Sequence, residues 1–221
     1  MVTIRRSIKY PEENDSYRIG QRPKVKVSIA DYGVGNLHSI RKALELAGAR
    51  PVIESNMKNL LDAEVIVFPG VGAFDSAMER LLPYKEMLAD RLNAGTPCLG
   101  ICIGAQILFE GSEEGRRPGL GIIKGNVIRL KAERVPHMGW NKVVSTDRAF
   151  EGTPSPYYYF AHSYHGVPSE DAAVATTDYF GEFPSAFRKM NVLGVQFHPE
   201  KSNASGAVFL RNFVKFIEAK L

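Results

Sequence analysis

Cysteine, tryptophan and long hydrophobic runs are all scarce in this sequence. Of its 221 residues, two are Cys and one is Trp. The cysteines, Cys98 and Cys102, are too few for a disulfide scaffold or a structural zinc site. No stretch reaches the roughly 20 apolar residues of a membrane helix, and charges interrupt the amino-terminal region where a secretion signal needs an apolar core. We therefore expect a cytoplasmic protein with no metal, cofactor or membrane contact, in which one thiol carries the chemistry.

A surface that binds nucleic acid is not indicated either, although the net charge is +4. Residues 1–26 hold seven Lys or Arg against three acidic residues, so residues 27–221 carry 21 charges of each sign. The basic excess therefore belongs to the amino-terminal tail. Residues 1–23 show no sustained period, and we predict a basic, flexible extension in preference to a binding arm. Residues 24–221 are numerous enough to form one domain with its own core.

Strand-like and helix-like patterns alternate through the first half of the chain. Apolar residues alternate at 25–29, apolar runs typical of buried strands fall at 65–68 and 97–101, and helical spacing appears at 37–47, 75–93 and 102–109. Pro83 should break or kink the second helix. After Gly119 short strands and aromatic residues dominate, before a closing helix from about Ser205. The sequence thus predicts an α/β fold: an open, doubly wound, mostly parallel sheet flanked by helices, with an antiparallel β extension.

A glycine-framed cysteine joins the third strand to its helix. The segment Gly100-Ile101-Cys102-Ile103-Gly104 is the thiol form of a nucleophile elbow, G-x-C-x-G. Glycine suits positions where side chains would strike neighbouring backbone in so tight a turn. The helix start favours a thiolate, and the N–H of Ile103 would face an oxyanion on the attacked carbonyl. By itself the pattern also fits a buried cysteine in a glycine-rich turn.

A base for this thiol is found near the carboxyl end of the chain. His198 follows a strand-like segment and is followed by Pro199 and Glu200. Proline fixes the backbone between imidazole and carboxylate, so Glu200 can hold one ring nitrogen while the other faces the thiol. The alternatives are two metal ligands, which are too few for a site, or a surface turn without chemistry. We predict a Cys102–His198–Glu200 triad.

These segments resemble a known family. Gly100–Gln106 and Gln196–Glu200 resemble the two signatures of class I (triad-type) glutamine amidotransferases. Four further blocks resemble the glutaminase-subunit family of imidazole glycerol phosphate synthase: Asp31–Asn36, Pro69–Phe74, Pro136–Asn141 and Tyr159–Tyr164. The resemblance covers residues 25–221, and nothing functional transfers to residues 1–23.

The resemblance implies a reaction and a set of glutamine-binding residues. Cys102 would attack the carboxamide carbon of glutamine, His198 would transfer the proton, and Glu200 would orient His198. Ammonia leaves, and water hydrolyses the γ-glutamyl thioester to glutamate. The residues expected to bind glutamine are Gly70, Gln106, Ser163 and Tyr164.

The resemblance also implies a second oxyanion donor that can be switched. In the family the strand at Pro69–Gly72 is thought to supply this donor, from Val71 or Gly72, after a peptide flips. Glycines on both sides of Val71 make such a rotation easy. One donor changes the rate about a hundredfold. A plain strand-to-helix turn is the alternative interpretation of this segment.

A partner surface is implied by the remaining blocks. By resemblance Asn36, Pro136, Met138 and Trp140 face a cyclase subunit, a (βα)8 barrel. That subunit would use the ammonia to make imidazole glycerol phosphate and aminoimidazole carboxamide ribonucleotide in histidine biosynthesis. Alternatively, Trp140 is a core residue. Other functions that stay open are a glutaminase for a different synthase, a thiol hydrolase of the same fold, and a regulatory module without catalysis.

Overall fold

The computed structural model describes residues 24–33 and 36–221. The predicted extension at 1–23 lies outside the described residues, as do residues 34–35 of the turn before Asn36. Among the described residues, no helix combines the length and the apolar character needed to cross a bilayer.

The centre of the fold is an eight-stranded sheet with the order β2-β1-β3-β4-β13-β12-β11-β8. Its strands are β1 (Lys26–Ala30), β2 (Arg50–Glu54), β3 (Ile66–Phe68), β4 (Cys98–Ile101), β8 (Val144–Ser145), β11 (Ala173–Asp178), β12 (Glu182–Lys189) and β13 (Val192–Val195). The five strands from β2 to β13 are parallel, and β12, β11 and β8 continue the sheet antiparallel. The predicted doubly wound sheet with an antiparallel extension is confirmed.

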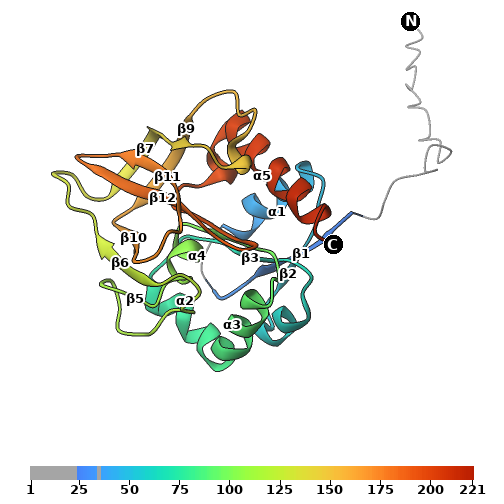
Figure 1. The fold of residues 1–221 in the computed structure, drawn as a ribbon. Coiled ribbons are helices and arrows are strands. Elements are labelled where there is room, and N and C mark those ends of the chain that lie inside the picture. Colours follow the sequence, from blue (N-terminus) through green and yellow to red (C-terminus); the bar gives the residue numbers. More distant parts are fainter. Residues whose placement is uncertain (1–23, 34–35) are drawn as a thin grey trace, which may run out of the picture.

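Helices cover both faces of this sheet (Figure 1). The helix α1 (Leu37–Leu46) contacts α5 (Asn203–Glu218) on one side, and α2 (Phe74–Leu81) and α3 (Lys85–Asn93) lie on the other. A single-turn helix, α4 (Ile103–Gln106), follows β4. Short 3-10 turns span Met57–Asp62, Leu82–Tyr84, Arg148–Phe150 and Pro199–Lys201.

Each central strand supplies side chains to two separate cores. In and next to β3, Val65 and Val67 belong to the cluster beneath α1 and α5, whereas Ile66 and Phe68 belong to the cluster beneath α2 and α3. Successive strand residues point to opposite faces, so a strand covered on both sides needs an unbroken apolar run. This is the physical origin of the run at 65–68.

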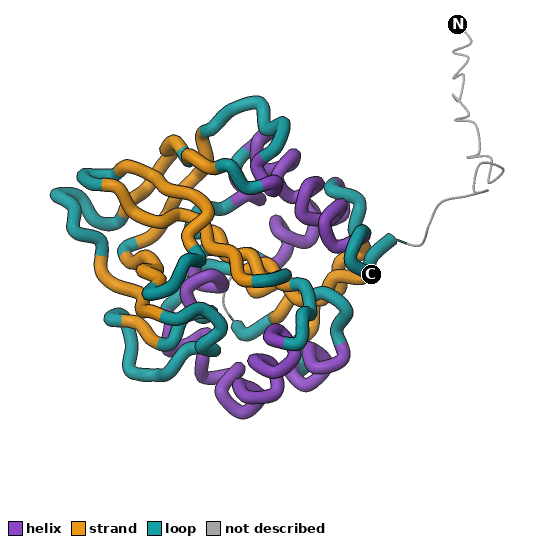
Figure 2. Tube along the Cα trace, in the orientation of Figure 1, coloured by secondary structure: helices purple, strands orange, loops and turns teal. Residues whose placement is uncertain are grey.

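The β-rich second half forms two smaller sheets beside the main one, and all strands are orange in Figure 2. One contains β5 (Gly111–Ser112), β6 (Gly125–Arg129) and β10 (Tyr164–Pro168), and the other pairs β7 (His137–Lys142) with β9 (Tyr157–His162) antiparallel. The end of β9 lies next to the residue that follows β4, since the backbone carbonyl of Ala161 lies 3.8 Å from Sγ of Cys102.

Two helix predictions had different outcomes. The helix expected at 75–93 is divided into α2 and α3 by a 3-10 turn that contains Pro83, as predicted. The helix expected from Cys102 to about Phe109 ends at Gln106, so that prediction was wrong in length. The carbonyls of residues 107–109 accept instead from Leu120, Ile123 and Gly121. Neither β2 nor β7 was predicted as a strand.

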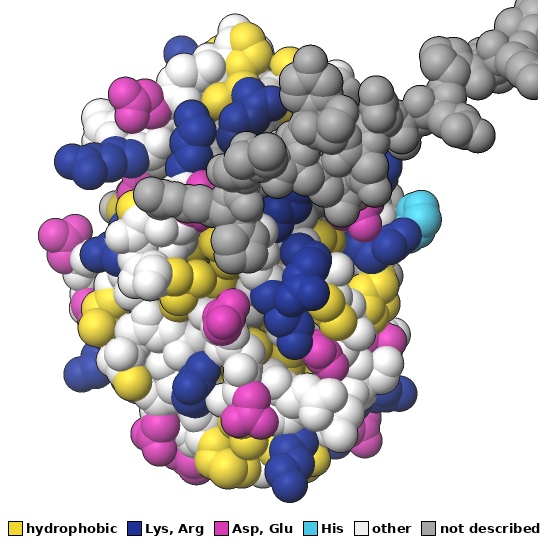
Figure 3. Space-filling model, turned by 90° about the vertical axis from the view of Figure 1, so that its right-hand side faces the viewer, with side chains coloured by type: hydrophobic (Ala, Val, Ile, Leu, Met, Phe, Trp, Pro, Cys, Tyr) yellow, Lys and Arg dark blue, Asp and Glu magenta, His cyan; other side chains and the backbone are white. Residues whose placement is uncertain are grey.

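Charges of both signs are mixed over the described part of the face in Figure 3. Lys and Arg side chains alternate there with Asp and Glu, in keeping with the equal numbers of both signs in residues 27–221. Elsewhere in the described residues, opposite charges also form close pairs, such as Arg41–Glu45 and Arg117–Glu79.

Two leucines of α1 give a matched test of the packing between α1 and the sheet. Leu44 is 0% exposed and Leu46 is 71% exposed. We predict that Leu44→Ala lowers the free energy of unfolding by about 2–5 kcal/mol, because it leaves a cavity under the helix. Leu46→Ala should change it by less than about 0.5 kcal/mol. Urea denaturation of both variants checks this, and equal losses would contradict the packing described.

Candidate active site

The nucleophile and the base follow two neighbouring parallel strands. In the pairing of β4 with β13, Ile101 lies opposite Val195. Cys102 follows Ile101 directly, and His198 comes three residues after Val195. Because carboxyl ends of parallel strands meet at one edge of a sheet, both side chains lie at the same edge. The backbone N–H of Cys102 also donates to the carbonyl of Val195 at 2.7 Å.

The elbow has the geometry that its glycines predict. Cys102 has φ of 51° and ψ of −109°, an unfavourable conformation for a non-glycine residue that costs about 1–3 kcal/mol. A Cβ at Gly104 would lie 1.9 Å from the carbonyl oxygen of Phe68, and a Cβ at Gly100 would lie 2.4 Å from that of Gly104. Only glycine allows the turn to pack this closely against β3.

His198 and Glu200 are both buried and paired with each other. Nδ1 of His198 lies 2.8 Å from Oε1 of Glu200, and the bridge between them is formed by the rigid Pro199 turn. Within the described part of the chain, Nε2 of His198 has no hydrogen-bond partner. The carboxylate thus fixes one ring nitrogen and leaves the other available for the thiol or the substrate.

The electrostatics of the site favour a charged imidazole. Burial by itself would lower the pKa of His198, but the interactions with Cys102 and Glu200 outweigh burial and raise that pKa to about 9. The surroundings of His198 thus favour its protonated form. A cationic ring next to the sulfur stabilises negative charge there.

A cavity of about 230 Å³ opens over the sulfur. Its lining consists of Val71, Gly72, Cys102, Ile103, Gln106, Glu114, Pro136, Met138, Ala161, His162, Ser163 and Tyr164. It thus brings together the predicted nucleophile, both predicted oxyanion segments and three of the predicted glutamine-binding residues. Its volume and its mixture of apolar walls with a few polar groups suit a small amino acid.

Other predicted residues lie at or beyond the rim of this cavity. Gly70 packs under the elbow, where a Cβ would be 1.8 Å from the carbonyl oxygen of Ile101. Of the predicted partner-facing residues, Pro136 and Met138 line the cavity, whereas Trp140 and Asn36 are exposed outside its lining. Trp140 is 48% exposed, so the alternative that it is a core residue was wrong.

Gln106 has its side chain largely engaged by the protein. Its Nε2 donates to the backbone carbonyl of Tyr164 at 2.8 Å and to Oε1 of Gln196 at 3.1 Å. The carbonyl of Ser163 accepts from the N–H of Leu130 at 2.9 Å. These contacts fix the wall of the cavity opposite the elbow.

Three neighbours of the site were missed by the sequence analysis. Nε2 of Gln196 lies 3.6 Å from Sγ of Cys102, and the carbonyl of Ala161 lies 3.8 Å from it. Glu114 lines the cavity and accepts from the N–H of Phe74 at the start of α2. Gln196 precedes His198 by two residues, and strand alternation places both on one face, a signal that could have found it. For Glu114 no such signal exists.

In the described residues no group of three or more His, Cys, Asp or Glu could hold a metal ion.

Comparisons with known proteins agree with this geometry. The family model "Glutamine amidotransferase class-I" matches residues 28–216. The imidazole glycerol phosphate synthase subunit HisH of Methanocaldococcus jannaschii is 50% identical over 196 residues, covering 86% of this chain and all of that protein. The HisH subunit of Thermococcus kodakarensis is 46% identical, covering 85% of this chain and 98% of its own length. The chain belongs to the HisH family of class-I glutamine amidotransferases.

Solved structures support the fold of this HisH family member. A glutamine amidotransferase aligns with a TM-score of 0.70 at 19% identity, covering 87% of this chain and 98% of that one. The PurLQS structure from Thermotoga maritima aligns with a TM-score of 0.66 at 18% identity, covering 88% of this chain and 99% of that one. At these identities the likeness concerns the fold alone.

The His198–Glu200 pair generates a prediction about charge. Because Glu200 raises the pKa of His198, Glu200→Gln should lower that pKa, which NMR titration of the imidazole measures. Glutaminase kcat should fall by about 10³–10⁴-fold, as for other triads that lose the orienting carboxylate. The control is Glu218→Gln at the exposed end of α5, which should change neither quantity. A His198 titration unaffected by Glu200→Gln would contradict the assignment.

Proposed function

We propose that this chain hydrolyses glutamine to glutamate and ammonia and passes the ammonia to a cyclase subunit of imidazole glycerol phosphate synthase. The observation that carries the proposal is the placement of Cys102 and the His198–Glu200 pair at the edge of adjacent strands, under one small cavity. Relatives named HisH at 45–50% identity favour this synthase over a different one. An intact triad argues against a module without catalysis.

The reaction follows from the charges of the site. The Cys102 thiolate attacks the carboxamide carbon, and the carbonyl oxygen becomes an oxyanion facing the N–H of Ile103. The C–N bond then breaks as His198 gives its proton to the departing ammonia, which leaves a γ-glutamyl thioester. Water attacks the thioester, His198 takes a proton from it, and the C–S bond breaks to release glutamate. Glu200 keeps the imidazole in orientation throughout.

The binding of glutamine is assigned to the cavity wall. Gly70 and Gln106, with the backbone of Ser163 and Tyr164, are proposed to hold the amino-acid end of the substrate. All but Gly70 line the cavity, and Gly70 lies directly beneath the elbow. No cofactor or metal takes part in this scheme, since thiol, imidazole and water supply every atom and proton.

The partner is proposed to be a (βα)8 barrel that docks on β7 and the turn at Asn36. Met138 and Trp140 alternate along β7 with exposed fractions of 64% and 48%, which suits a docking surface with large apolar anchors. Pro136 and Met138 also line the cavity, so a partner on this strand would cover the site. Covering matters because ammonia is protonated in open water and then loses its nucleophilicity.

The proposed setting is the cytoplasm, where thiols such as Cys102 stay reduced. The products made with the ammonia would be imidazole glycerol phosphate and aminoimidazole carboxamide ribonucleotide, for histidine biosynthesis. Residues 24–221 are proposed as the amidotransferase domain, with residues 1–23 a basic extension that takes no part in catalysis.

The two cysteines give a direct test of the function. In complex with the cyclase subunit, Cys102→Ala should abolish glutamine-dependent synthesis, while added ammonium salt still supports it, because only ammonia release needs the thiol. Cys98→Ala is the matched control: burial raises the pKa of Cys98 and keeps it an inert thiol, so activity should persist. Glutaminase activity that survives in Cys102→Ala would refute the proposal.

The loop segment at Gly70–Gly72, between β3 and α2, is the proposed point of control. Gly72 has φ of 140°, a conformation that side chains disfavour, and Val71 beside it is partly exposed in the cavity. The hydroxyl of buried Tyr32 donates to the carbonyl of Pro69 and anchors the start of this segment. Rotation of one peptide after this anchor would add or remove an oxyanion N–H from Val71 or Gly72.

This control predicts a dependence on the partner. The isolated chain should turn glutamine over slowly, and the cyclase subunit with its ribonucleotide ligand should accelerate it about a hundredfold, the effect of one oxyanion donor. Glutaminase assays with and without the partner and the ligand measure this. Equal rates in all three states would remove the argument for a switch.

A further inference from the structure

Gln196 is a buried polar side chain with no role in the triad. It is 0% exposed, and its backbone N–H donates to the carbonyl of Ser185 on β12. It lies just beyond the end of β13, two residues before His198. Its Nε2 lies 3.6 Å from Sγ of Cys102, within the range of a hydrogen bond to sulfur.

The direction of this amide is set by its neighbours. Nε2 of Gln106 faces the carbonyl of Tyr164 at 2.8 Å, and a carbonyl oxygen can only accept, so this atom must be the nitrogen. The same nitrogen lies 3.1 Å from Gln196, which must therefore present Oε1 to it. The N–H group of Gln196 is thereby turned toward the sulfur.

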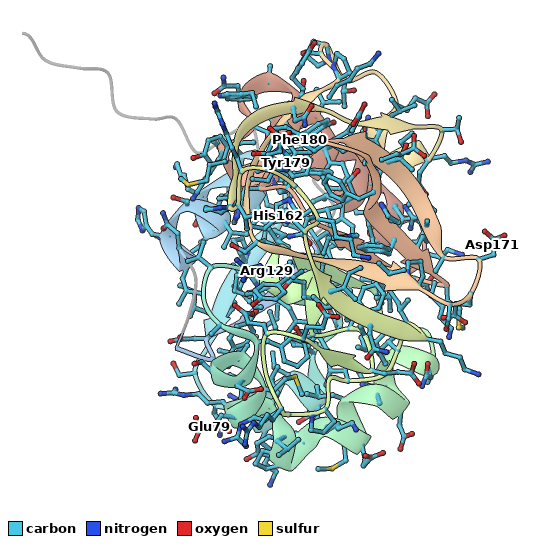
Figure 4. All side chains as sticks on the ribbon, turned by 90° about the vertical axis from the view of Figure 1, so that its left-hand side faces the viewer. Glu79, Arg129, His162, Asp171, Tyr179 and Phe180 are labelled. Atoms are coloured by element: carbon cyan, nitrogen blue, oxygen red, sulfur yellow. The ribbon has the colours of Figure 1, made fainter. Side chains whose placement is uncertain are left out.

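The carbonyl of Tyr164 is itself held from a second side. Nδ1 of His162 lies 2.8 Å from it and must donate, which leaves Nε2 of His162 to accept from Nδ1 of His137 at 3.1 Å. Nε2 of His137 then accepts from Asn141 at 3.3 Å. Burial lowers the pKa of His137 to about 4 and that of His162 to about 3, so both rings stay neutral and the directions persist at neutral pH. Figure 4 labels His162 and Tyr179, both of which contact His137.

The far end of this network is fixed by backbone groups as well. Asn141 donates to the carbonyl of Asp178 at 2.8 Å and accepts from the N–H of Lys142 at 2.7 Å. Its amide can therefore take only one orientation. The direction of each hydrogen bond from Asn141 to Gln196 thus has a single assignment, which fixes the orientation of the Gln196 amide.

We infer that Gln196 is a catalytic residue, whose side-chain N–H donates to Sγ of Cys102 and stabilises the thiolate that attacks glutamine. The inference rests on the proposed glutaminase function. The sulfur faces one donor, Gln196, and one acceptor, the carbonyl of Ala161. A thiolate at Cys102 is attracted by the N–H of Gln196 and repelled by the carbonyl oxygen of Ala161. The hydrogen bond from Gln196 therefore offsets this repulsion. His198 supplies the proton, and Gln196 supplies a neutral dipole that needs no proton transfer.

The test uses the complete chain with Cys98→Ala, so that alkylation by iodoacetamide reports Cys102 alone. Gln196→Met keeps the side-chain length and removes the donor. We expect the alkylation rate at neutral pH to fall about tenfold and the pH midpoint of alkylation to rise by about one unit, since hydrogen bonds to charged groups have this strength. In the glutaminase assay, kcat should fall about tenfold with little change in KM for glutamine. The control Ser185→Ala removes a buried hydroxyl next to Gln196 and should leave the midpoint unchanged.

A second variant covers the case in which Gln196→Met does not fold. Gln106→Met removes the group that orients Gln196 and should shift the alkylation midpoint in the same direction by a smaller amount. An unchanged midpoint in either folded variant would overturn the inference, because loss of packing alone does not move the ionisation of the thiol. Failure of the proposed function is distinguishable, since it would appear as glutaminase activity in Cys102→Ala whatever the alkylation profile.

Discussion

The N–H of Cys102 donates to the carbonyl of Val195, and this hydrogen bond carries the β4–β13 ladder one residue past the end of β4. Through it the nucleophile, the base and Gln196 share one rigid frame. Cys102 can be held at φ of 51° because the ladder on one side and the close-packed glycines on the other leave no room to relax. The remaining elements of the fold supply the apolar cover that keeps these two strands paired.

Three buried histidines in this half of the molecule show how the surroundings decide the charge. His137 and His162 lie among aromatic rings and neutral amides, so burial lowers the pKa of each. His198 is buried as well, but it has a carboxylate on one side and the thiol on the other, and its pKa is raised. Burial lowers the pKa of all three imidazoles, and at His198 the neighbouring carboxylate and thiol outweigh that effect. The environment of His198 therefore favours a protonated ring, whereas His137 and His162 stay neutral.

The triad and the fold class could be predicted because each is encoded locally. The elbow glycines, the His198–Glu200 turn, the two-sided apolar run at 65–68 and the break at Pro83 each require only a few neighbouring residues. The strand β7 could not be predicted, because its apolar residues Met138 and Trp140 lie on the exposed face, whereas the less exposed face carries His137, Gly139 and Asn141. The helix α4 is short because the carbonyls of residues 107–109 accept hydrogen bonds from Leu120, Gly121 and Ile123. Glu114 lines the cavity from a loop that is distant in sequence from Cys102 and His198. Both depend on tertiary contacts, which local patterns do not contain.

Gly104 packs closely against Phe68, and Gly70 packs closely against Ile101. The elbow side of the cavity is therefore much more tightly packed than the opposite side. On the elbow side, a methyl group added at Gly104 or Gly70 would collide with backbone and displace Cys102, so these two positions accept only glycine. The opposite wall includes Met138 of β7, which is 64% exposed and is not held by such close packing. Substitutions on the Met138 side can therefore change which partner binds, while Cys102, His198 and the distance between them stay unchanged.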